Sequence, residues 1–218
     1  MMTRLSGKTA LVTGASKGIG RATALALGGR GAHVLVHYRS GAKEAEAVVT
    51  QITANGGRAD AVFADLLAAD GAHRLAAHVR SLIGGRLDIL VANAGLYKAA
   101  SIEDTTVNDF DQLFAVNVRA PFFLVQQLVS FMDEGSSIVL VSSLAAHSAF
   151  GTIAAYAASK GRSRHIGATL RIRIGRAWYS RQCRGAGFGR ERRRGCAQGR
   201  SASRPRPEYA GPQAGGPA

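Results

Sequence analysis

Short apolar runs and longer amphipathic segments follow one another along the first 160 residues of the chain. Each run is five or six residues long and ends in small or polar residues, as do strands buried on both faces of a parallel sheet. The runs are Thr9–Thr13, His33–Tyr38, Asp60–Ala64, Leu87–Ala92 and Ser137–Val141. This alternation of strand and helix predicts an α/β fold on a doubly wound parallel sheet of about five strands.

The predicted helices connect these strands. They cover Arg21–Gly28, Ala42–Asn55, Ala68–Leu82 and Asp109–Met132. The last one contains Asn117, whose amide needs hydrogen-bond partners on an apolar helical face, and Pro121, which we expect to kink or divide the helix. Its apolar stretch Ala120–Met132 is broken by two glutamines and falls short of the roughly eighteen residues that span a bilayer. We therefore expect no membrane partner.

Three glycines follow the first strand. Gly14 permits a sharp turn, Gly18 lets the backbone approach a pyrophosphate, and Gly20 lets the next helix pack closely on the sheet. The start of that helix adds unpaired N–H groups and the positive end of its dipole. Strand, glycine loop and helix in this order indicate a phosphate site, although three glycines alone are also compatible with an ordinary turn. The candidate cofactor-binding residues in the loop are Gly14, Ser16, Lys17, Gly18, Ile19 and Gly20.

The end of the second strand indicates which dinucleotide binds. A protein selecting NAD carries an acidic residue there for the ribose 2′-hydroxyl, but this chain has Tyr38-Arg39-Ser40 and no carboxylate before Glu44. Arg39 could pair with a 2′-phosphate, and Lys17 could add charge from the loop. The alternative is that both are solvated surface cations. Residues 39 and 40 favour NADP over NAD.

Polar residues also follow the other predicted strands. Asp65 and Leu66 come after the third strand, where the carboxylate could accept from an adenine amino group or simply cap a helix. Asn93-Ala94-Gly95 follows the fourth strand, and Ser142-Ser143 follows the fifth. Because ligands bind at the carboxyl ends of parallel strands, we expect these segments to face one crevice.

Tyr156 and Lys160 are four residues apart and would lie one turn apart on one face of a helix. The positive charge of the lysine would favour the ionised phenol and so prepare it for proton transfer. Taken alone, the pattern favours a surface helix with an ordinary Tyr and Lys.

Together these motifs resemble the short-chain dehydrogenase/reductase family over residues 1–161. They are Thr13-Gly14-x-x-x-Gly18-x-Gly20, Asp65, Asn93-Ala94-Gly95, Asn117, Ser143 and Tyr156-x-x-x-Lys160, in the family's order and spacing. Ala92 departs from the pattern, since many members have a second Asn there. The loop with Lys17 and Arg39 is similar to the NADP-preferring branch that includes 3-oxoacyl-acyl carrier protein reductases and glucose dehydrogenases. The resemblance implies a Rossmann-like fold.

The resemblance also implies roles for four residues in exchanging a hydride between NADP(H) and a small carbonyl or alcohol substrate. Tyr156 would be the general acid or base, and Lys160 would support it and hold the nicotinamide ribose. Ser143 would bond the substrate oxygen, chosen over Ser142 because it lies thirteen residues before Tyr156. Asn117 would position a water in the proton relay. The family further suggests a homo-oligomer.

Residues 162–218 do not resemble the family. The chain has a formal net charge of +14, and residues 161–218 carry 14 arginines against only two glutamates. Such an Arg-, Gly- and Pro-rich tail is expected to be irregular or disordered, which divides the chain into a catalytic domain, 1–161, and a tail, 162–218. One functional interpretation is a nucleotide-binding regulator whose tail binds nucleic acid. We consider nucleic acid a less favoured partner than a small molecule.

A second interpretation is that the tail is a frameshifted translation beginning between Lys160 and Arg164. Permitted codons for Arg164–Glu191, read one base later, can encode a helix, a strand and a Pro-Gly turn typical of the family. We therefore expect loss of the family's C-terminal part to impair turnover and oligomer contacts.

The cellular location is predicted from cysteines and from the N-terminus. Both cysteines, Cys183 and Cys196, lie in the tail, and Met1–Lys8 lacks the apolar segment of a signal peptide, which favours a cytoplasmic protein. The six histidines show no metal-ligand spacing, so we expect no metal site.

Overall fold

The structure, a computed structural model, describes residues 5–147 and 151–161. In this part of the chain five parallel strands form one sheet in the order β3-β2-β1-β4-β5. They are β1 (Thr9–Val12), β2 (His33–Tyr38), β3 (Arg58–Phe63), β4 (Ile89–Ala92) and β5 (Ser137–Leu140). The strand order reverses between β1 and β4, which creates a crevice at their carboxyl ends. The predicted doubly wound, Rossmann-like sheet is confirmed.

Two strands begin at residues other than those predicted. β3 begins at Arg58, opposite His33, rather than at Asp60. β4 begins at Ile89 rather than at Leu87, because the Leu87 amide donates to the carbonyl of Phe131 outside the ladder. Leu87 is nevertheless fully buried, so its apolar character reflects the core and not strand pairing.

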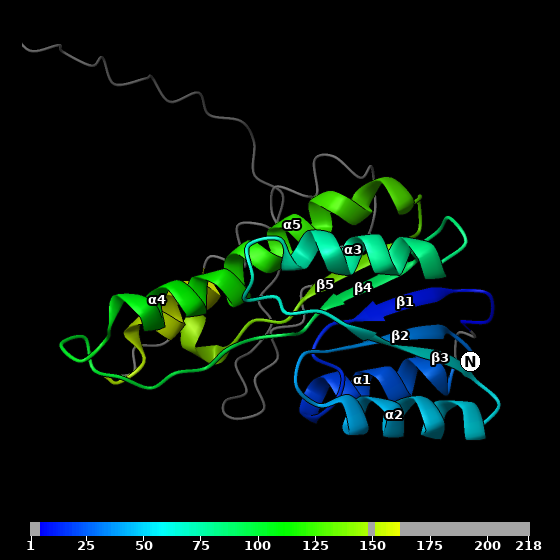
Figure 1. The fold of residues 1–218 in the computed structure, drawn as a ribbon, viewed down its shortest axis with the longest axis horizontal. Coiled ribbons are helices and arrows are strands. Elements are labelled where there is room, and N and C mark those ends of the chain that lie inside the picture. Colours follow the sequence, from blue (N-terminus) through cyan, green and yellow to red (C-terminus); the bar gives the residue numbers. More distant parts are fainter. Residues whose placement is uncertain (1–4, 148–150, 162–218) are drawn as a thin grey trace, which may run out of the picture. The chain divides into compact units, whose positions relative to one another are not determined.

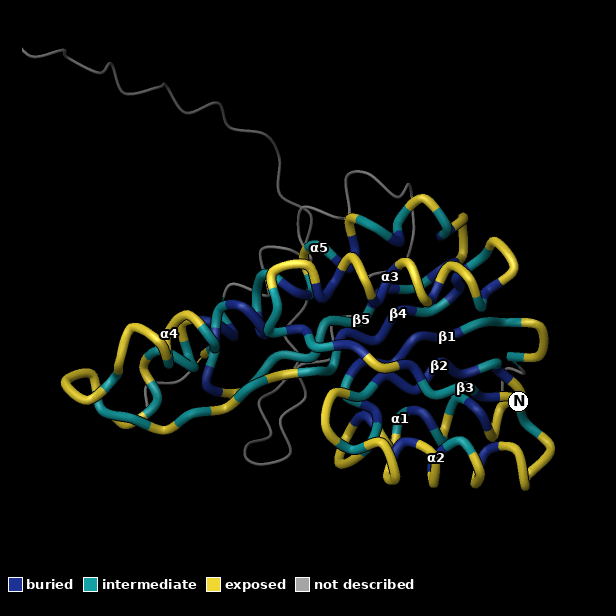
Figure 2. Tube along the Cα trace, in the orientation of Figure 1, coloured by how far each residue is buried: buried dark blue, intermediate teal, exposed yellow. Residues whose placement is uncertain are grey.

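Helices cover both faces of the sheet (Figure 1). On one face lie α1 (Gly18–Gly28) and α2 (Ala42–Ala54), and on the other α3 (Gly71–Leu82) and α5 (Ala120–Leu128). Successive strand residues point to opposite faces, so Leu35 packs in the core under α3 and α5 while Val34 and Val36 pack under α1 and α2. The central strands β1, β2 and β4 are accordingly mostly buried in Figure 2, whereas the edge strands β3 and β5 are less so. Burial on both faces explains the apolar runs in the sequence.

The predicted long helix is interrupted by a π-turn and not by its proline. α4 (Val107–Phe114) leads into a π-helical segment, Ala115–Arg119, which continues directly into α5. The Ala120 amide donates to the carbonyl of Ala115, five residues back. Pro121 lies two residues after this segment, so the helix is divided just before the proline and not at it.

Helical residues from Val107 to Phe131 form a run of 25 residues, which contains an 18-residue window with a mean hydropathy of 1.3. By length and composition alone this run could cross a membrane, so the prediction that no segment reaches that length is wrong. The prediction counted uninterrupted apolar residues, whereas a helix tolerates the two glutamines. In the structure Leu124 and Leu128 of this run are buried in the core beside α3, as in the core helix of a globular protein, and one such helix is weak evidence for a span.

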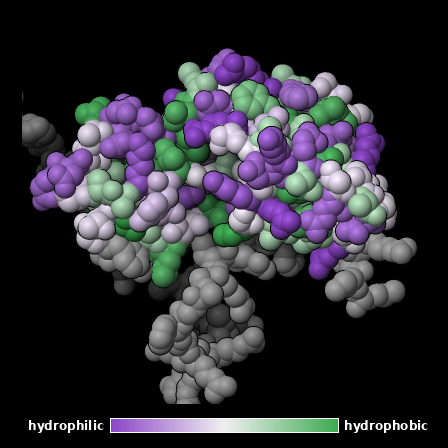
Figure 3. Space-filling view, turned by 60° about the horizontal axis from the view of Figure 1, so that its bottom comes forward, coloured by the Kyte–Doolittle hydropathy of each residue, from purple (hydrophilic) through white to green (hydrophobic). Residues whose placement is uncertain are grey.

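Apolar side chains are also exposed on the described part of the chain. The face in Figure 3 mixes hydrophilic and hydrophobic residues. The largest exposed apolar side chains include Ile102, Val107 and Phe110 around the start of α4. Residues 162–218, on which the predictions of disorder, frameshift and nucleic-acid binding fall, lie outside the described residues.

Candidate active site

A pocket of about 330 Å³ opens at the carboxyl ends of the strands. Four loops contribute its walls: the glycine loop after β1 and the segments after β2, β3 and β4. Of the residues predicted to bind the cofactor, it is lined by Gly14, Ser16, Lys17, Arg39, Ser40, Asp65, Leu66, Asn93, Ala94 and Gly95. The structure thus brings four predicted strand-end segments into one site, at the point where the strand order reverses.

Gly18, Ile19 and Gly20 form the first turn of α1. A Cβ on Gly20 would lie 2.2 Å from the carbonyl oxygen of Gly14, so only glycine fits where the helix crosses the loop. Gly14 itself has a φ of 62°, a conformation that favours glycine. The close approach shapes a tight glycine loop that lines the pocket through Gly14, Ser16 and Lys17 and leads into a helix N-terminus, an arrangement that suits a pyrophosphate.

Thr13 and Asn93 tie the glycine loop to the end of β4. The Thr13 hydroxyl oxygen accepts from the amides of Asn93 and Ala94, each at 2.9 Å. The Asn93 side-chain amide donates to the carbonyls of Thr13 and Gly14 at 2.9 and 3.2 Å. Asn93 therefore fixes the loop through backbone atoms, and both hydrogen bonds are donated by its side-chain nitrogen.

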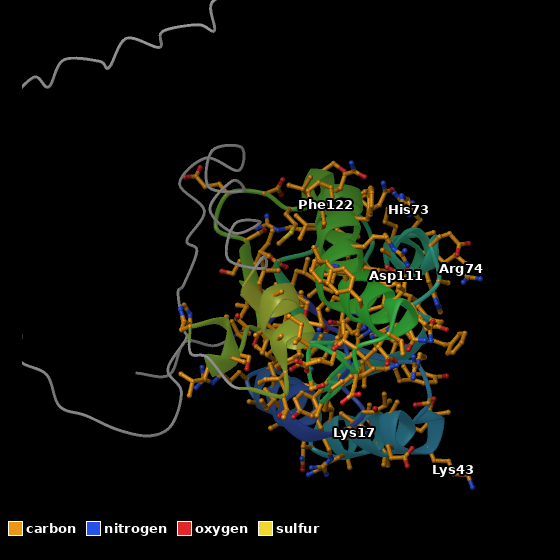
Figure 4. The ribbon with its side chains drawn as sticks, turned by 90° about the vertical axis from the view of Figure 1, so that its left-hand side faces the viewer. Lys17, Lys43, His73, Arg74, Asp111 and Phe122 are labelled. Carbon is orange, nitrogen blue, oxygen red and sulfur yellow. The ribbon has the colours of Figure 1, made fainter. Side chains whose placement is uncertain are left out.

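The charged groups of the pocket lie at its rim. Arg39 forms a 3.9 Å ion pair with Asp65, and both side chains are about half exposed. Asp65 also accepts from the Leu67 amide at 2.9 Å, which closes a local turn and is not the helix cap predicted as one alternative, because α3 begins at Gly71 with Asp70 at its N-cap. Lys17 is exposed at the start of α1, on the same side of the sheet as Lys43 of α2 (Figure 4). Two cations at this rim suit an anionic ligand.

Asn117 lies inside the π-turn and is almost completely buried. Its side-chain oxygen accepts from the Leu96 amide at 2.9 Å, and its nitrogen donates to the Leu96 carbonyl and to the hydroxyl oxygen of Ser159, both at 2.9 Å. The Ser159 hydroxyl in turn donates to the carbonyl of Tyr156 at 2.7 Å. Asn117 thus connects the segment after β4 to the helix that carries Tyr156.

Lys160 has its ammonium group beside the pocket wall. Residues 154–161 are helical, which places Lys160 one turn after Tyr156 as predicted. Its Nζ donates to the Val141 carbonyl at 3.3 Å, and a Cβ on Gly95 would lie only 2.9 Å from that Nζ. Lys160 is 6% exposed, and this burial lowers the pKa of its ammonium group.

Tyr156 and the two serines lie around this lysine. The Tyr156 ring meets the ring of Tyr97 edge-on, with 5.0 Å between centroids. Ser142 donates to the Lys160 carbonyl at 3.2 Å, whereas Ser143 accepts from the Ala145 amide at 3.2 Å. Within the described residues no hydrogen bond joins Ser143 to Tyr156. Because its oxygen acts as acceptor, the Ser143 hydroxyl proton stays available for a ligand.

Several contributors to the site were missed at the level of sequence. The pocket is also lined by His37, Tyr38, Leu67, Leu96 and Val116. Arg119 donates to the Leu67 carbonyl at 2.6 Å and so ties the π-turn to the segment after β3. The sequence did offer a signal for His37, because a polar residue inside an apolar strand needs hydrogen-bond partners. Arg119 and Ser159 gave no such signal, because their partners are distant in sequence.

No group of three or more His, Cys, Asp or Glu side chains suited to a metal ion occurs among residues 5–147 and 151–161. The predicted catalytic residues Asn117, Ser143, Tyr156 and Lys160 do not line the pocket themselves, but Lys160 lies directly behind Gly95, which does. This arrangement suits proton transfer to a ligand held beside a dinucleotide.

Comparison with known proteins agrees with this geometry. The chain is 44% identical over 170 residues to an uncharacterized oxidoreductase of Methylorubrum extorquens, covering 78% of this chain and 68% of that protein. It is 46% identical over 141 residues to versicolorin reductase 1 of Aspergillus parasiticus, covering 64% and 53%. The chain thus spans between half and about two thirds of the length of these relatives.

Solved structures give the same result. The crystal structure of the angucycline C-6 ketoreductase LanV with bound NADP matches with a TM-score of 0.75 and 42% identity, covering 78% of this chain and 68% of that one. A blue fluorescent protein from a metagenomic library, in complex with NADPH, matches with a TM-score of 0.75 and 32% identity, covering 79% and 70%.

The family profile described as short chain dehydrogenase matches residues 8–176. The similarity to the family therefore extends fifteen residues beyond residue 161, which is the last residue covered by the motif-based resemblance. A match over most of the chain, with the strand order and the ligand pocket in agreement, settles the family. This chain belongs to the short-chain dehydrogenase family.

Proposed function

We propose that this chain reduces the ketone group of a small molecule with NADPH, or catalyses the reverse oxidation. The observation that carries the proposal is the Lys160 ammonium, which lies against Gly95 while Gly95 also lines the nucleotide pocket. Because the two share this wall, a substrate beside the cofactor would lie close to the helix of Tyr156 and Lys160. When bound, NADPH would supply the hydride.

The proposal gives each residue of the wall a task. Tyr156 donates its hydroxyl proton to the carbonyl oxygen, and the Lys160 charge stabilises the phenolate that remains. Ser143 donates its free hydroxyl proton to the same oxygen. Asn117, fixed by Leu96 and Ser159, holds the π-turn in place beside Lys160 and positions a water for proton return.

The preference for NADPH over NADH is part of the proposal. Arg39 and Lys17 stand at the pocket rim, and no carboxylate occupies the end of β2 where a ribose 2′-hydroxyl would be bound. Arg39 can leave Asp65 at little cost, since ion pairs between half-exposed side chains contribute little. The NADP and NADPH bound in two similar structures support this choice.

Relatives also guide the choice of substrates to test. They include versicolorin and hydroxynaphthalene reductases and a ketoreductase solved with rabelomycin. The exposed ring of Tyr97 beside Tyr156 supports aromatic ketones as the first class. Aliphatic ketones and 3-oxoacyl thioesters complete the panel.

The test measures NADPH binding and turnover separately. NADPH binding is followed by fluorescence titration, and ketone reduction by the loss of NADPH absorbance. We expect Tyr156→Phe to lower turnover by roughly 10² to 10⁴-fold while NADPH binding stays within about twofold. Tyr97→Phe is the matched control, since it also removes a phenol oxygen but leaves the proton donor. A protein that does not bind NADPH, or equal turnover in Tyr156→Phe, would contradict the proposal.

A further inference from the structure

His37 is a polar residue in the most buried part of the sheet. It is the fifth residue of β2 and is 2% exposed, and the strand residues before it, Val34 to Val36, are fully buried and apolar. A valine or isoleucine would suit a strand covered on both faces, whereas an imidazole there needs hydrogen bonds for its ring nitrogens. Both nitrogens have a partner, and both partners belong to segments that line the nucleotide pocket.

The first partner is the glycine loop. The amide of Gly14 donates to His37 Nδ1 at 3.0 Å, and the amide of the next residue, Ala15, donates to the His37 backbone carbonyl at 2.8 Å. One residue of β2 thus takes two consecutive loop amides. These amides anchor the loop, which leaves the following ones, from Ser16 onward, to face a pyrophosphate.

The second partner lies at the opposite side of the pocket. His37 Nε2 is 3.1 Å from the carbonyl oxygen of Ala64, the residue that follows β3 and precedes Asp65 and Leu66. Ala64 is buried, and its amide donates to the carbonyl of Tyr38 at 3.1 Å. The side chain of His37 therefore spans the floor of the pocket between the phosphate loop and the segment after β3.

The two partners determine the state of the ring. An amide N–H can only donate, so Nδ1 carries no proton, and a carbonyl can only accept, so Nε2 carries one. Burial lowers the pKa of His37 to about 4, although the Ala64 hydrogen bond and the Asp65 charge act in the opposite direction. The charged groups of the pocket near this ring are Asp65, Lys17 and Arg39. At neutral pH the ring is thus a neutral donor and acceptor.

We propose that His37 is a positioning residue for the dinucleotide: by joining Gly14 to Ala64, it sets the separation of the phosphate-binding loop from the Asp65 side of the pocket. This inference rests on the proposed function, because it concerns NADPH binding. His37 acts through backbone atoms of the pocket and not on the proton transferred by Tyr156. Its removal should weaken NADPH binding and leave turnover at saturating NADPH nearly unchanged.

Two variants remove its hydrogen bonds stepwise. His37→Leu loses both and leaves the Gly14 amide and the Ala64 carbonyl without partners, so we expect the NADPH dissociation constant to rise about a hundredfold. His37→Asn keeps an acceptor for the Gly14 amide but is too short to reach Ala64 as well, so we expect a rise of about tenfold. For both variants kcat at saturating NADPH should stay within about threefold.

His33→Leu is the matched control. His33 begins the same strand, and its Nε2 is 2.5 Å from Asp60 Oδ2, but it does not line the pocket. The same His-to-Leu change there should leave the NADPH dissociation constant within about twofold. Circular dichroism and cofactor-free unfolding midpoints show whether each variant folds.

The outcomes separate this inference from the proposed function. If the unmodified protein does not bind NADPH, the proposed function fails and this inference with it. If it binds NADPH and folded His37→Leu and His37→Asn bind equally well, only this inference is overturned. A fall in kcat as large as the loss of affinity, or loss of folding in both variants, would also overturn it. If only His37→Leu fails to fold, His37→Asn decides by the same criterion.

Discussion

The proposed nucleotide pocket and the proposed catalytic wall, which consists of Asn117, Ser143, Tyr156 and Lys160, are built in different ways, although Gly95 adjoins both. Around the glycine loop, side chains bond mainly to backbone atoms: Asn93 holds two carbonyls and His37 holds an amide and a carbonyl. Along the catalytic wall, side chains also bond to one another, as Asn117 does to Ser159, and a buried ammonium group must be held in position.

This difference predicts different sensitivities. A pocket made of backbone atoms should tolerate many changes in side-chain polarity but should fail when added volume displaces the chain. A wall that depends on a few polar atoms should keep its fold but lose rate when one of those atoms moves. Substitutions of single glycines in the two regions test the comparison directly.

The largest effect is expected from Gly20→Ala in the nucleotide pocket. The new Cβ would lie 2.2 Å from the Gly14 carbonyl oxygen and 2.9 Å from its carbon, so the backbone itself must move. Overpacking of this kind costs about 1–3 kcal/mol of folding stability. Because the displaced Gly14 lines the pocket, we also expect NADPH affinity to fall about a hundredfold. Fluorescence titration and the unfolding midpoint measure both losses. Gly151→Ala should change neither, since no atom of residues 5–147 and 151–161 lies within 4 Å of the new Cβ.

Gly95→Ala tests the catalytic wall. Its Cβ would meet Lys160 Nζ at 2.9 Å and Asn117 Oδ1 at 3.3 Å, and the lysine end can move aside without backbone strain. We expect the unfolding midpoint to change little, because only a flexible side chain is displaced. Turnover should nevertheless fall by roughly 10 to 100-fold, since the ammonium group leaves its position beside Gly95 and the Val141 carbonyl. Steady-state kinetics with thermal unfolding check this; a large loss of stability with unchanged kcat would reverse the comparison.

Arg39→Ala should have a smaller and more selective effect. Because Arg39 is half exposed, its removal should not disturb the fold. Only the affinity for a ligand with a 2′-phosphate should fall. We expect NADPH affinity to fall about tenfold and NADH affinity to stay within about twofold. Lys43→Ala is the control, since Lys43 is a nearby exposed cation on α2 that does not line the pocket. Equal losses for both cofactors would argue against a 2′-phosphate contact.

Prediction from the sequence succeeded for local features and failed for contacts between distant segments. Strands, helices and the strand-end segments could be predicted, because apolar periodicity and the glycine loop are local patterns that mark where a parallel sheet ends. Contacts that join distant segments could not: His37 bonds residues 23 and 27 positions away, Ser159 bonds one 42 positions away, and Arg119 one 52 positions away. The π-turn was also missed, because the irregularity of this helix was predicted at Pro121.

The smallest effect on binding and turnover is expected at the other end of the sheet, outside both regions. Asp88 precedes β4, and its buried carboxylate accepts from Lys8 at 2.9 Å, the Thr9 amide at 3.0 Å and Arg86 at 2.9 Å. Burial alone would raise the pKa of this carboxyl, but the three hydrogen bonds outweigh it and lower the pKa below its ordinary value of 3.8. The carboxylate therefore stabilises the fold only while it is ionised.

A folded-state pKa below the unfolded one gives stability that is present above the unfolded pKa and lost as the pH falls through the folded one. Asp88→Asn should thus lower the free energy of unfolding by about 2 kcal/mol at pH 7, and the difference from the unmodified protein should shrink below about pH 4. Urea unfolding at several pH values measures it. The NADPH dissociation constant at pH 7 should stay within about twofold, because Asp88 supports the sheet from the edge opposite the pocket; a large change in affinity would mean that the two edges are coupled.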